Sequence, residues 1–323
     1  MTDLILKKTA ETVLLLFGIT LVSFAVIHLA PGSPVDAQAQ FNPKMTAQAR
    51  EKLTQLYGLD KPVLEQYGRW LSRLARLDFG DSFVDGEKVT AKVGRAVPVT
   101  LLINGLALLI IFGLGVPLGV WSAVRRGTGA ERIVTLLALF GISVPSFWLA
   151  LVLMSVFGVT LHILPVSGLF SVFHEDMGPG EGVADVARHL VLPLGVASLA
   201  GVAGVSRFMR SSMLGVLGEN YIRTARAKGL SEGRVLYGHA LPNAILPVIT
   251  LLGLSVPGLL GGSVIFESIF SIPGMGRLFF NSVSSRDYPV VMGMLVLGAV
   301  LTLAGNLLAD AAYGAADPRI RVK

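Results

Sequence analysis

Residues 99–124 read VTLLINGLALLIIFGLGVPLGVWSAV, a run of 26 residues without Asp, Glu, Lys or Arg. An α-helix of about 20 apolar residues is long enough to cross the hydrocarbon core of a bilayer. Lipid tolerates only helices and closed barrels, and this run lacks the alternation of apolar and polar residues that marks barrel strands. The run therefore predicts a transmembrane helix.

Five further runs without charged residues bring the number of expected spans to six. They are residues 13–30, 133–161, 190–206, 240–266 and 288–309. Hydrophobic residues make up 53% of the 323-residue chain, charged residues only 15%, and the mean hydropathy is +0.68. Soluble domains carry about 25% charged residues. A soluble fold is thus excluded, and we expect an all-α integral membrane protein of six transmembrane helices.

The charges that flank the spans predict that both termini are cytoplasmic. With the N-terminus inside, the inner segments carry fourteen basic and seven acidic residues, and the outer segments carry thirteen and fourteen. This is the imbalance expected from the positive-inside rule. Lys7 and Lys8 ahead of the first span resemble the start of a signal peptide, but an A-x-A cleavage pattern is missing before Pro31. We expect an uncleaved membrane anchor.

The outer segment between the first two spans, residues 31–98, is too long to be a simple connector. Pro62 begins a predicted amphipathic helix. Its apolar residues recur every three or four positions and are Val63, Leu64, Tyr67, Trp70, Leu71, Leu74 and Leu77. Such a helix either packs on the outer ends of the bundle, which we favour, or docks a partner or lipid headgroups.

Several classes of chemistry have no residues to support them. The sequence contains no cysteine, no G-x-x-x-x-G-K-[ST] phosphate loop, and neither an H-E-x-x-H nor a G-x-S-x-G motif. Its five histidines lack metal-ligand spacing. We therefore expect no catalysis, cofactor or metal in this chain. The absence of charged residues from the six runs also argues against an ion-gradient-driven secondary transporter, which stays open as the alternative.

A short basic segment follows the fourth span on the inner side. Residues 220–230 read NYIRTARAKGL, with Asn220 as the expected N-cap, Glu219 as its alternative and Gly229 as the C-terminal stop. Arg223 and Arg226 lie toward the end of the predicted helix, where the helix dipole favours positive charge. On these residues alone, an ordinary basic loop is an equally good interpretation.

The spacing that follows resembles the cytoplasmic signature of bacterial ABC-importer permeases, E-A-A-x3-G-x9-I-x-L-P. Ala225, Gly229, Leu241 and Pro242 match this signature, and Arg223, Thr224 and His239 depart from it. The departures are similar to the dipeptide/oligopeptide/nickel branch of these permeases, which typically reads Y-x-R-T-A-R-A-K-G-L followed by H-A-L.

Other landmarks of that family follow in order along most of the chain. They are PGSP at 31–34, LYGLDKP at 56–62, PVTL at 98–101, FESIF at 266–270, IPGMG at 272–276 and DYP at 287–289. Each alone is weak, but their shared order and spacing identify the chain as similar to this family.

The resemblance implies a type I ABC-importer permease fold in a bacterial inner membrane. It makes the helix near 220–230 a coupling helix that inserts into a groove on a separate ATPase. The coupling residues would be Tyr221, Arg223, Thr224, Ala225, Arg226, Gly229, His239, Leu241 and Pro242. Gly229 would permit close approach, and Ala225 would leave room for the other protein.

The implied function is that of a permease subunit which forms half of the pathway of an ATP-driven importer for peptides or related solutes. The implied partners are a second permease, two ATP-binding subunits that hold ATP and magnesium, and an external solute-binding protein, with no nucleic acid. We expect the divisions 1–30, 31–98, 99–313 and 314–323. Asn104 and Asn306 are candidate pathway-lining residues, because their amides are costly to leave in lipid.

Two smaller expectations concern packing. Gly115-x-x-x-Gly119 and Gly258-x-x-x-Gly262 have the spacing of small residues that lets membrane helices approach closely. For Glu267, which follows the fifth span, we favour structural hydrogen bonding over a role as an outer gate.

Overall fold

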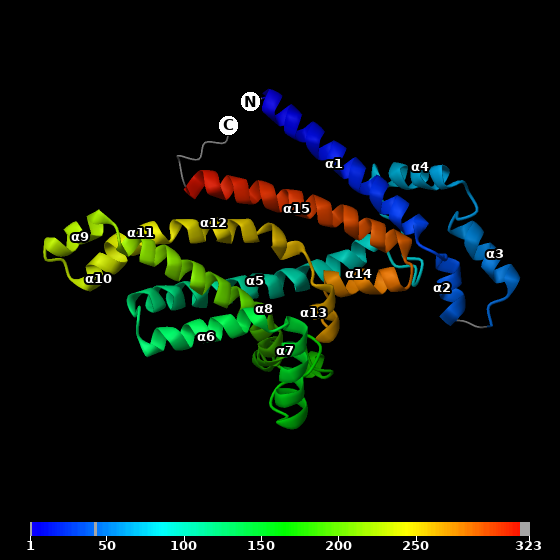
Figure 1. Cartoon of the computed structure of the whole chain (residues 1–323). Coiled ribbons are helices and arrows are strands. Elements are labelled where there is room, and N and C mark those ends of the chain that lie inside the picture. The colour runs from blue at the N-terminus through cyan, green and yellow to red at the C-terminus, as the bar shows by residue number, and fades with distance from the viewer. Residues whose placement is uncertain (1, 42–43, 317–323) are drawn as a thin grey trace. The chain divides into compact units, whose positions relative to one another are not determined.

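The structure is a computed structural model that describes residues 2–41 and 44–316. The described residues are mostly helical, with one isolated antiparallel bridge between Asp81 and Lys88. Four helices are long and apolar enough to cross a membrane, and the number rises to six if each of two bent helix pairs is one span. The prediction of an all-α membrane protein is confirmed (Figure 1).

The chain is divided into fifteen α-helices over the described residues. In order these are α1 (Thr2–Leu29), α2 (Pro34–Phe41), α3 (Ala47–Leu56), α4 (Val63–Leu74), α5 (Val89–Val124), α6 (Gly129–Ser143), α7 (Ser146–Leu153), α8 (Pro179–Leu217), α9 (Asn220–Ala227), α10 (Glu232–Arg234), α11 (Leu241–Ala244), α12 (Leu246–Ser255), α13 (Val264–Ile269), α14 (Met275–Ser284) and α15 (Tyr288–Ala316). Single π-helical turns cover Met154–Thr160 (η1) and Val235–Ala240 (η3), and 3₁₀ turns cover His174–Asp176 (η2) and Pro257–Leu260 (η4).

The third predicted span, residues 133–161, is not straight. The helix direction changes by 101° between α6 and the segment Ser146–Thr160. Pro145 has no N–H and disfavours helical geometry in the residue before it, and Val144 accordingly has extended backbone angles of φ −81° and ψ 126°. The apolar run is therefore a bent pair of helices, with the break at the proline.

The fifth predicted span, residues 240–266, is also broken. Glu232–Ala244 and Leu246–Ser255 are inclined by 44° to each other. Pro247 stands near the start of α12, where its missing N–H leaves no helical hydrogen bond unmade. Past Ser255 the chain continues as the short turn η4 and then as α13, so only the first part of this apolar run belongs to a candidate span.

Packing divides the chain into two compact units. The first combines the residues up to 100 with 260–267 and 273–305, and the second combines 101–259 with 268–272 and the residues from 306 on. The first apolar helix and the outer segment therefore belong to one packed unit. The divisions at 30/31, 98/99 and 313/314 stay a prediction about function.

Within the first unit, α4 packs against α1 through one face. The Tyr67 hydroxyl lies 2.9 Å from Oγ1 of the buried Thr20, and the Tyr67 ring lies 5.1 Å from the Phe24 ring between centroids. Pro62 is the N-cap residue of α4, as predicted. Leu64, in contrast, is 86% exposed, so the apolar face is narrower than the sequence indicates.

A buried carboxylate holds the outer loop of the first unit in place. Asp287 is 1% exposed and accepts hydrogen bonds from the Ser82 hydroxyl at 2.5 Å and from the Phe83 N–H at 2.9 Å. Burial raises the pKa of the Asp287 carboxyl above its ordinary value, and the hydrogen bonds from Ser82 and Phe83 act in the opposite direction. Lys92 Nζ lies 3.9 Å from Asp287 and 2.6 Å from Asp85.

We predict that Asp287→Ala lowers the free energy of unfolding by about 1–3 kcal/mol, because it leaves the buried donors of Ser82 and Phe83 without an acceptor. Thermal unfolding in detergent micelles, followed by tryptophan fluorescence, measures the change. Asp60→Ala is the matched control, since Asp60 pairs only with its exposed neighbour Lys61, and we expect a loss below about 0.5 kcal/mol. Equal shifts for the two variants would contradict the anchoring role.

Candidate functional site

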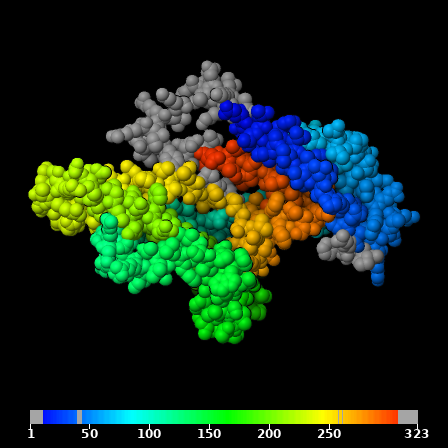
Figure 2. Space-filling model, viewed as in Figure 1, coloured from blue at the N-terminus to red at the C-terminus, as the bar shows by residue number. Residues whose placement is uncertain are grey.

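The short helix α9 is seated on the second unit by two side chains. Ile222 is fully buried and Ala225 is 7% exposed, and both belong to a hydrophobic cluster with Met209 and Met213 of α8 and Val235 of η3. A helix of eight residues is too short to be stable alone. Its order therefore depends on this seat. Figures 1 and 2 show α9 beside α10 at the left of the view.

The opposite face of α9 is exposed and basic. Tyr221 is 43% exposed, and Arg223, Thr224 and Arg226 are also exposed. Arg226 donates to Glu232 at 2.8 Å, whereas Arg223 makes no ion pair within the described part of the chain. Our expectation that Ala225 faces another protein is wrong, because its small side chain lets α9 lie close against its own unit.

Glycine ends α9 in the way the sequence predicts. Gly229 has φ +76°, its N–H donates to the Arg226 carbonyl at 2.9 Å, and the Leu230 N–H donates to the Ala225 carbonyl at 3.4 Å. These two bonds form a Schellman motif, which needs a residue with positive φ at this position. At the other end the N-cap residue is Glu219, so the alternative is correct and Asn220 is wrong as the cap.

Between α10 and α12 the chain forms the π-helical turn η3 and the short helix α11. Leu241 is partly buried against the same hydrophobic cluster, His239 is half-buried, and Pro242 is exposed. Pro242 lacks an N–H, and the wider π-helical turn η3 immediately precedes α11, in which it stands. The Asn243 side-chain amide donates to the His239 carbonyl at 2.9 Å. This segment supports α9 from beneath.

The helix α8 carries part of the hydrophobic cluster on which α9 packs. Three contacts hold α8 against its neighbours. An added Cβ at Gly115 would lie 2.9 Å from Val205, and one at Gly119 would lie 2.5 Å from the Ser206 carbonyl oxygen. The Gly115-x-x-x-Gly119 prediction is thus confirmed as close packing of α5 on α8. In addition, the Ser212 hydroxyl donates to the Ala244 carbonyl of α11 at 2.7 Å.

An ion pair joins α8 to α6 at the same end of the unit. Arg210 donates to the Glu131 carboxylate, which is 8% exposed. The other Glu131 oxygen accepts the Gly127 N–H at 2.5 Å. Displacement of α9 would therefore be transmitted to α8, and from α8 to α5, α6 and α11.

A buried hydrogen-bond network lies in the first unit around Glu267, which is 3% exposed. Its carboxylate accepts hydrogen bonds from the Thr100 hydroxyl at 3.0 Å and from the Arg277 N–H at 2.9 Å. The Thr100 oxygen in turn accepts the Met275 N–H at 2.8 Å. The prediction that Glu267 makes structural hydrogen bonds is confirmed.

Glycines make room for that carboxylate. An added Cβ at Gly274 would lie 2.6 Å from the carboxyl carbon of Glu267, and one at Gly276 would lie 2.6 Å from the backbone of Ser263. An added Cβ at Gly262 would overlap the backbone of Gly276 at the start of α14, whereas Gly258 has no neighbour within 4 Å of its Cβ position. The prediction of close packing is thus confirmed at Gly262, which meets the start of α14 from a loop, and is wrong at Gly258.

The two asparagines proposed to line a pathway have different environments. The Asn104 side-chain amide donates to the Leu259 carbonyl at 2.8 Å, which satisfies a backbone group in the turn η4. Asn306 is exposed on α15. A lining role for either stays a prediction.

In the outer loop of the second unit, Asp185 contacts two histidines and a backbone N–H. Asp185 lies 3.0 Å from Nδ1 of His174 and 3.4 Å from Nδ1 of His189, and it accepts the Ser171 N–H at 2.8 Å. Among the residues that the structure describes, no group of three or more potential ligands could hold a metal ion. The cluster orders this loop.

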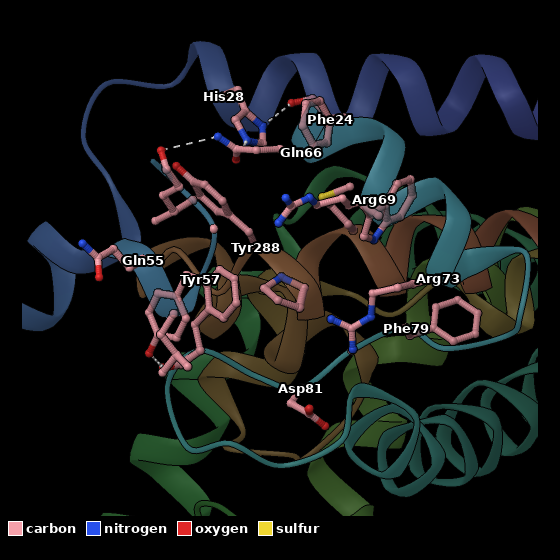
Figure 3. Close-up of a pocket in the computed structure, with 18 residues that line it drawn as sticks. Phe24, His28, Gln55, Tyr57, Gln66, Arg69, Arg73, Phe79, Asp81 and Tyr288 are labelled. Atoms are coloured by element: carbon pink, nitrogen blue, oxygen red, sulfur yellow. Dashed lines mark hydrogen bonds between the residues drawn. The ribbon is translucent and has the colours of Figure 1, made fainter. Parts of the chain in front are cut away.

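The first unit also contains a cavity of about 300 Å³, which no sequence pattern indicates (Figure 3). It lies among α1, α4, the loop around residues 79–83 and the start of α15. Tyr57 donates to the Phe83 carbonyl at 2.8 Å, and His28 bonds to Gln66 at 3.2 Å. Because much of its polar lining is already hydrogen-bonded within the protein, we assign it no ligand.

Comparison with known proteins adds an independent line of evidence. Residues 115–322 match the family described as "Binding-protein-dependent transport system inner membrane component", and residues 1–104 match the N-terminal model of such membrane components. The chain is 40% identical over 321 residues to the oligopeptide transport system permease protein AppB of Bacillus subtilis, with 99% of both chains covered.

Other relatives agree with this match. The dipeptide transport system permease protein DppB of Escherichia coli is 39% identical over 342 residues, with both chains fully covered. The di/tripeptide transport system permease protein DppB of Pseudomonas aeruginosa is 39% identical over 338 residues, with 99% of both covered. A structure of the MetNI methionine ABC transporter in an inward-facing conformation is similar with 18% identity and a TM-score of 0.48, covering 68% of this chain and 95% of that one.

We predict that Gly274→Ala destabilises the protein by roughly 1–3 kcal/mol, because the new methyl group overlaps the buried Glu267 carboxylate. The melting temperature in detergent and the yield of folded protein report the loss. Gly298→Ala serves as the control, since nothing lies within 4 Å of its Cβ position on α15. If Gly274→Ala and the wild type have the same melting temperature, close packing around Glu267 is not required for stability.

Proposed function

Because the chain belongs to the family of binding-protein-dependent transport system inner membrane components, we propose that it is the permease subunit of an ATP-driven importer of peptides or related small solutes. The observation that carries this proposal is identity of 39–40% to peptide permeases over 99% or more of both chains. Such full-length similarity includes the spans, the outer segment and the basic segment around α9. An ion-gradient-driven mechanism has no support, since the charge-free runs offer no intramembrane carboxylate.

The ATPase binds at the exposed face of α9 in this proposal. Two features support this: α9 is held in place by Ile222 and Ala225, and its outward face presents Tyr221 together with Arg223, which forms no ion pair with any residue that the structure describes. An arginine in such a position makes charge-assisted hydrogen bonds with acidic groups of a partner. The Schellman turn at Gly229 keeps the end of α9 compact, so that a groove can enclose it.

Movement of the ATPase then reaches the spans through packed contacts. The cluster beneath α9 includes Met209 and Met213 of α8, and α8 is fixed to α6 through Arg210 and Glu131. A short helix that is held at several points transmits a displacement as a rigid body, which is how small shifts become larger rearrangements in packed proteins. Nucleotide-driven motion of α9 would thereby open and close the pathway.

The remaining parts of the importer lie on other chains. The sequence has no phosphate loop, so ATP and magnesium belong to two ATP-binding subunits. A second permease supplies the other half of the pathway, with Asn104 and Asn306 as the candidate lining residues here. A solute-binding protein delivers peptides on the outer side. The excess of basic residues on the inner segments supports a cytoplasmic position for both termini.

Substitution of Gly229 tests the coupling role. We predict that Gly229→Val lowers the peptide imported per ATP hydrolysed by roughly tenfold, because a β-branched residue at φ +76° is strained by about 1–2 kcal/mol and distorts the end of α9. ATP hydrolysis by the assembled complex in proteoliposomes should continue. Gly233→Val is the matched control, since Gly233 lies in α10 without positive φ and with an open Cβ position. Unchanged coupling in Gly229→Val would count against α9.

Reconstitution tests the energy source. We expect vesicles that hold the complete complex and the binding protein to accumulate a labelled dipeptide only when ATP is present inside. Vesicles that hold this chain alone should show no uptake under a proton or sodium gradient. Gradient-driven uptake by the isolated chain would overturn the importer assignment and support the secondary transporter.

A further inference from the structure

A groove in the second unit lies near the same end as α9 and is separate from the exposed face of α9. Its volume is about 630 Å³, and its walls come from the C-terminal half of α5, the start of α6 and the η3–α11 segment. Val116, Leu118 and Val124 of α5, Val134 of α6 and Leu241 of α11 give it a mostly apolar wall. Val124 is 50% exposed and Leu118 is 37% exposed, so this wall is open to the surroundings of the protein.

Two aromatic side chains stand at the edge of this groove. Trp121 is 37% exposed and Tyr237 is 65% exposed. Tryptophan and tyrosine concentrate at the level of lipid headgroups, where one part of the ring faces hydrocarbon and its polar atom faces water. Arg125 also lines the groove, and its guanidinium carbon lies 4.8 Å from the centre of the Trp121 ring. The cation is thus held at the boundary between the apolar wall and water.

The turn between α5 and α6 carries positive charge that the described protein leaves unneutralised. Arg125, Arg126 and Arg132 are exposed, and none of them forms an ion pair within the described residues. The turn contains a single acidic residue, Glu131, which is 8% exposed and bound by Arg210 and by the Gly127 N–H. The acid is turned inward, and the three cations are turned outward.

We propose that this groove binds an anionic phospholipid, with the phosphate at Arg125 and an acyl chain along the apolar wall of α5. Charge complementarity selects the headgroup, since an exposed arginine near a membrane surface favours anionic lipid by about fivefold. The apolar wall at the end of a spanning helix selects a lipid over a water-soluble anion. In the proposed orientation this leaflet faces the cytoplasm, where anionic lipids are enriched. The site goes beyond peptide import and does not depend on the substrate.

The position of the groove connects the lipid to the coupling segment. Leu236 and Leu241 line the groove, and both also pack in the hydrophobic cluster that seats α9. A lipid bound in the groove would therefore contact the same η3 and α11 side chains that hold α9.

Quenching of tryptophan fluorescence by brominated lipid tests the proposal on the full chain. The probe is Trp121 in a Trp70→Phe, Trp148→Phe background, which removes the other two tryptophans. The chain is reconstituted in phosphatidylcholine vesicles with a minor fraction of brominated phosphatidylglycerol, or with the same fraction of brominated phosphatidylcholine. We expect stronger quenching by brominated phosphatidylglycerol, and we expect the difference to shrink at high salt.

Charge variants separate a site from general attraction to the membrane. Arg125→Gln should reduce the preference for phosphatidylglycerol by about fivefold, and Arg125→Lys should retain most of it, because lysine keeps the charge. Arg207→Gln is the matched control, since Arg207 is an exposed arginine of α8 that does not line the groove. Far-UV circular dichroism confirms that each variant is as helical as the parent.

Three outcomes would overturn the proposal. Equal quenching by the two brominated lipids would show that the groove does not select the headgroup. A preference that survives Arg125→Gln would place the lipid elsewhere. Loss of quenching when the second permease is co-reconstituted would assign the groove to that subunit instead of a lipid.

Discussion

Lipid offers no hydrogen-bond partners, so the membrane-spanning part of this structure depends on how backbone groups are satisfied without water. The long helices α1, α5, α8 and α15 satisfy them internally. Where proline removes an N–H, the chain adapts locally: it bends by 101° next to Pro145 and forms a π-helical turn just ahead of Pro242. The Asn104 amide, which bonds to the Leu259 carbonyl, supplies one of the replacement hydrogen bonds at a break. Where a span is interrupted, a local change of backbone geometry or a side-chain hydrogen bond therefore compensates for the helical hydrogen bonds that are lost.

Buried carboxylates unite the segments of the first unit. Glu267 collects donors from Thr100 and Arg277, and Asp287 collects donors from Ser82 and Phe83. Each acid joins parts of the chain that are far apart in sequence. A buried charge with several donors is costly to disturb, because the loss of one group leaves others without partners. Both acids thus act as fixed points around which the outer loop and the helix starts are arranged.

In the second unit, packed side chains make α9 a rigid part of the structure. Ile222 and Ala225 seat α9, Gly229 ends it, and Arg210 with Glu131 secures the helix beneath it. The exposed face of α9 is the surface at which we propose that the ATPase binds. The groove at Arg125 adds a second contact surface to the same end of the unit, and the two surfaces share the hydrophobic cluster that contains Leu241. Protein and lipid would then act on one mechanical element.

The sequence by itself determined that the protein lies in a membrane, that it is helical, where its apolar spans are, and that Gly229 ends α9. Each of these depends on composition or on residues close together in the chain. It also indicated Glu267 as a structural group. Only the tertiary structure decided that Ala225 faces inward, that Gly262 packs against the start of α14, and that His174 meets Asp185. Those facts depend on which distant segments become neighbours, and local patterns of hydrophobicity contain no record of such pairings.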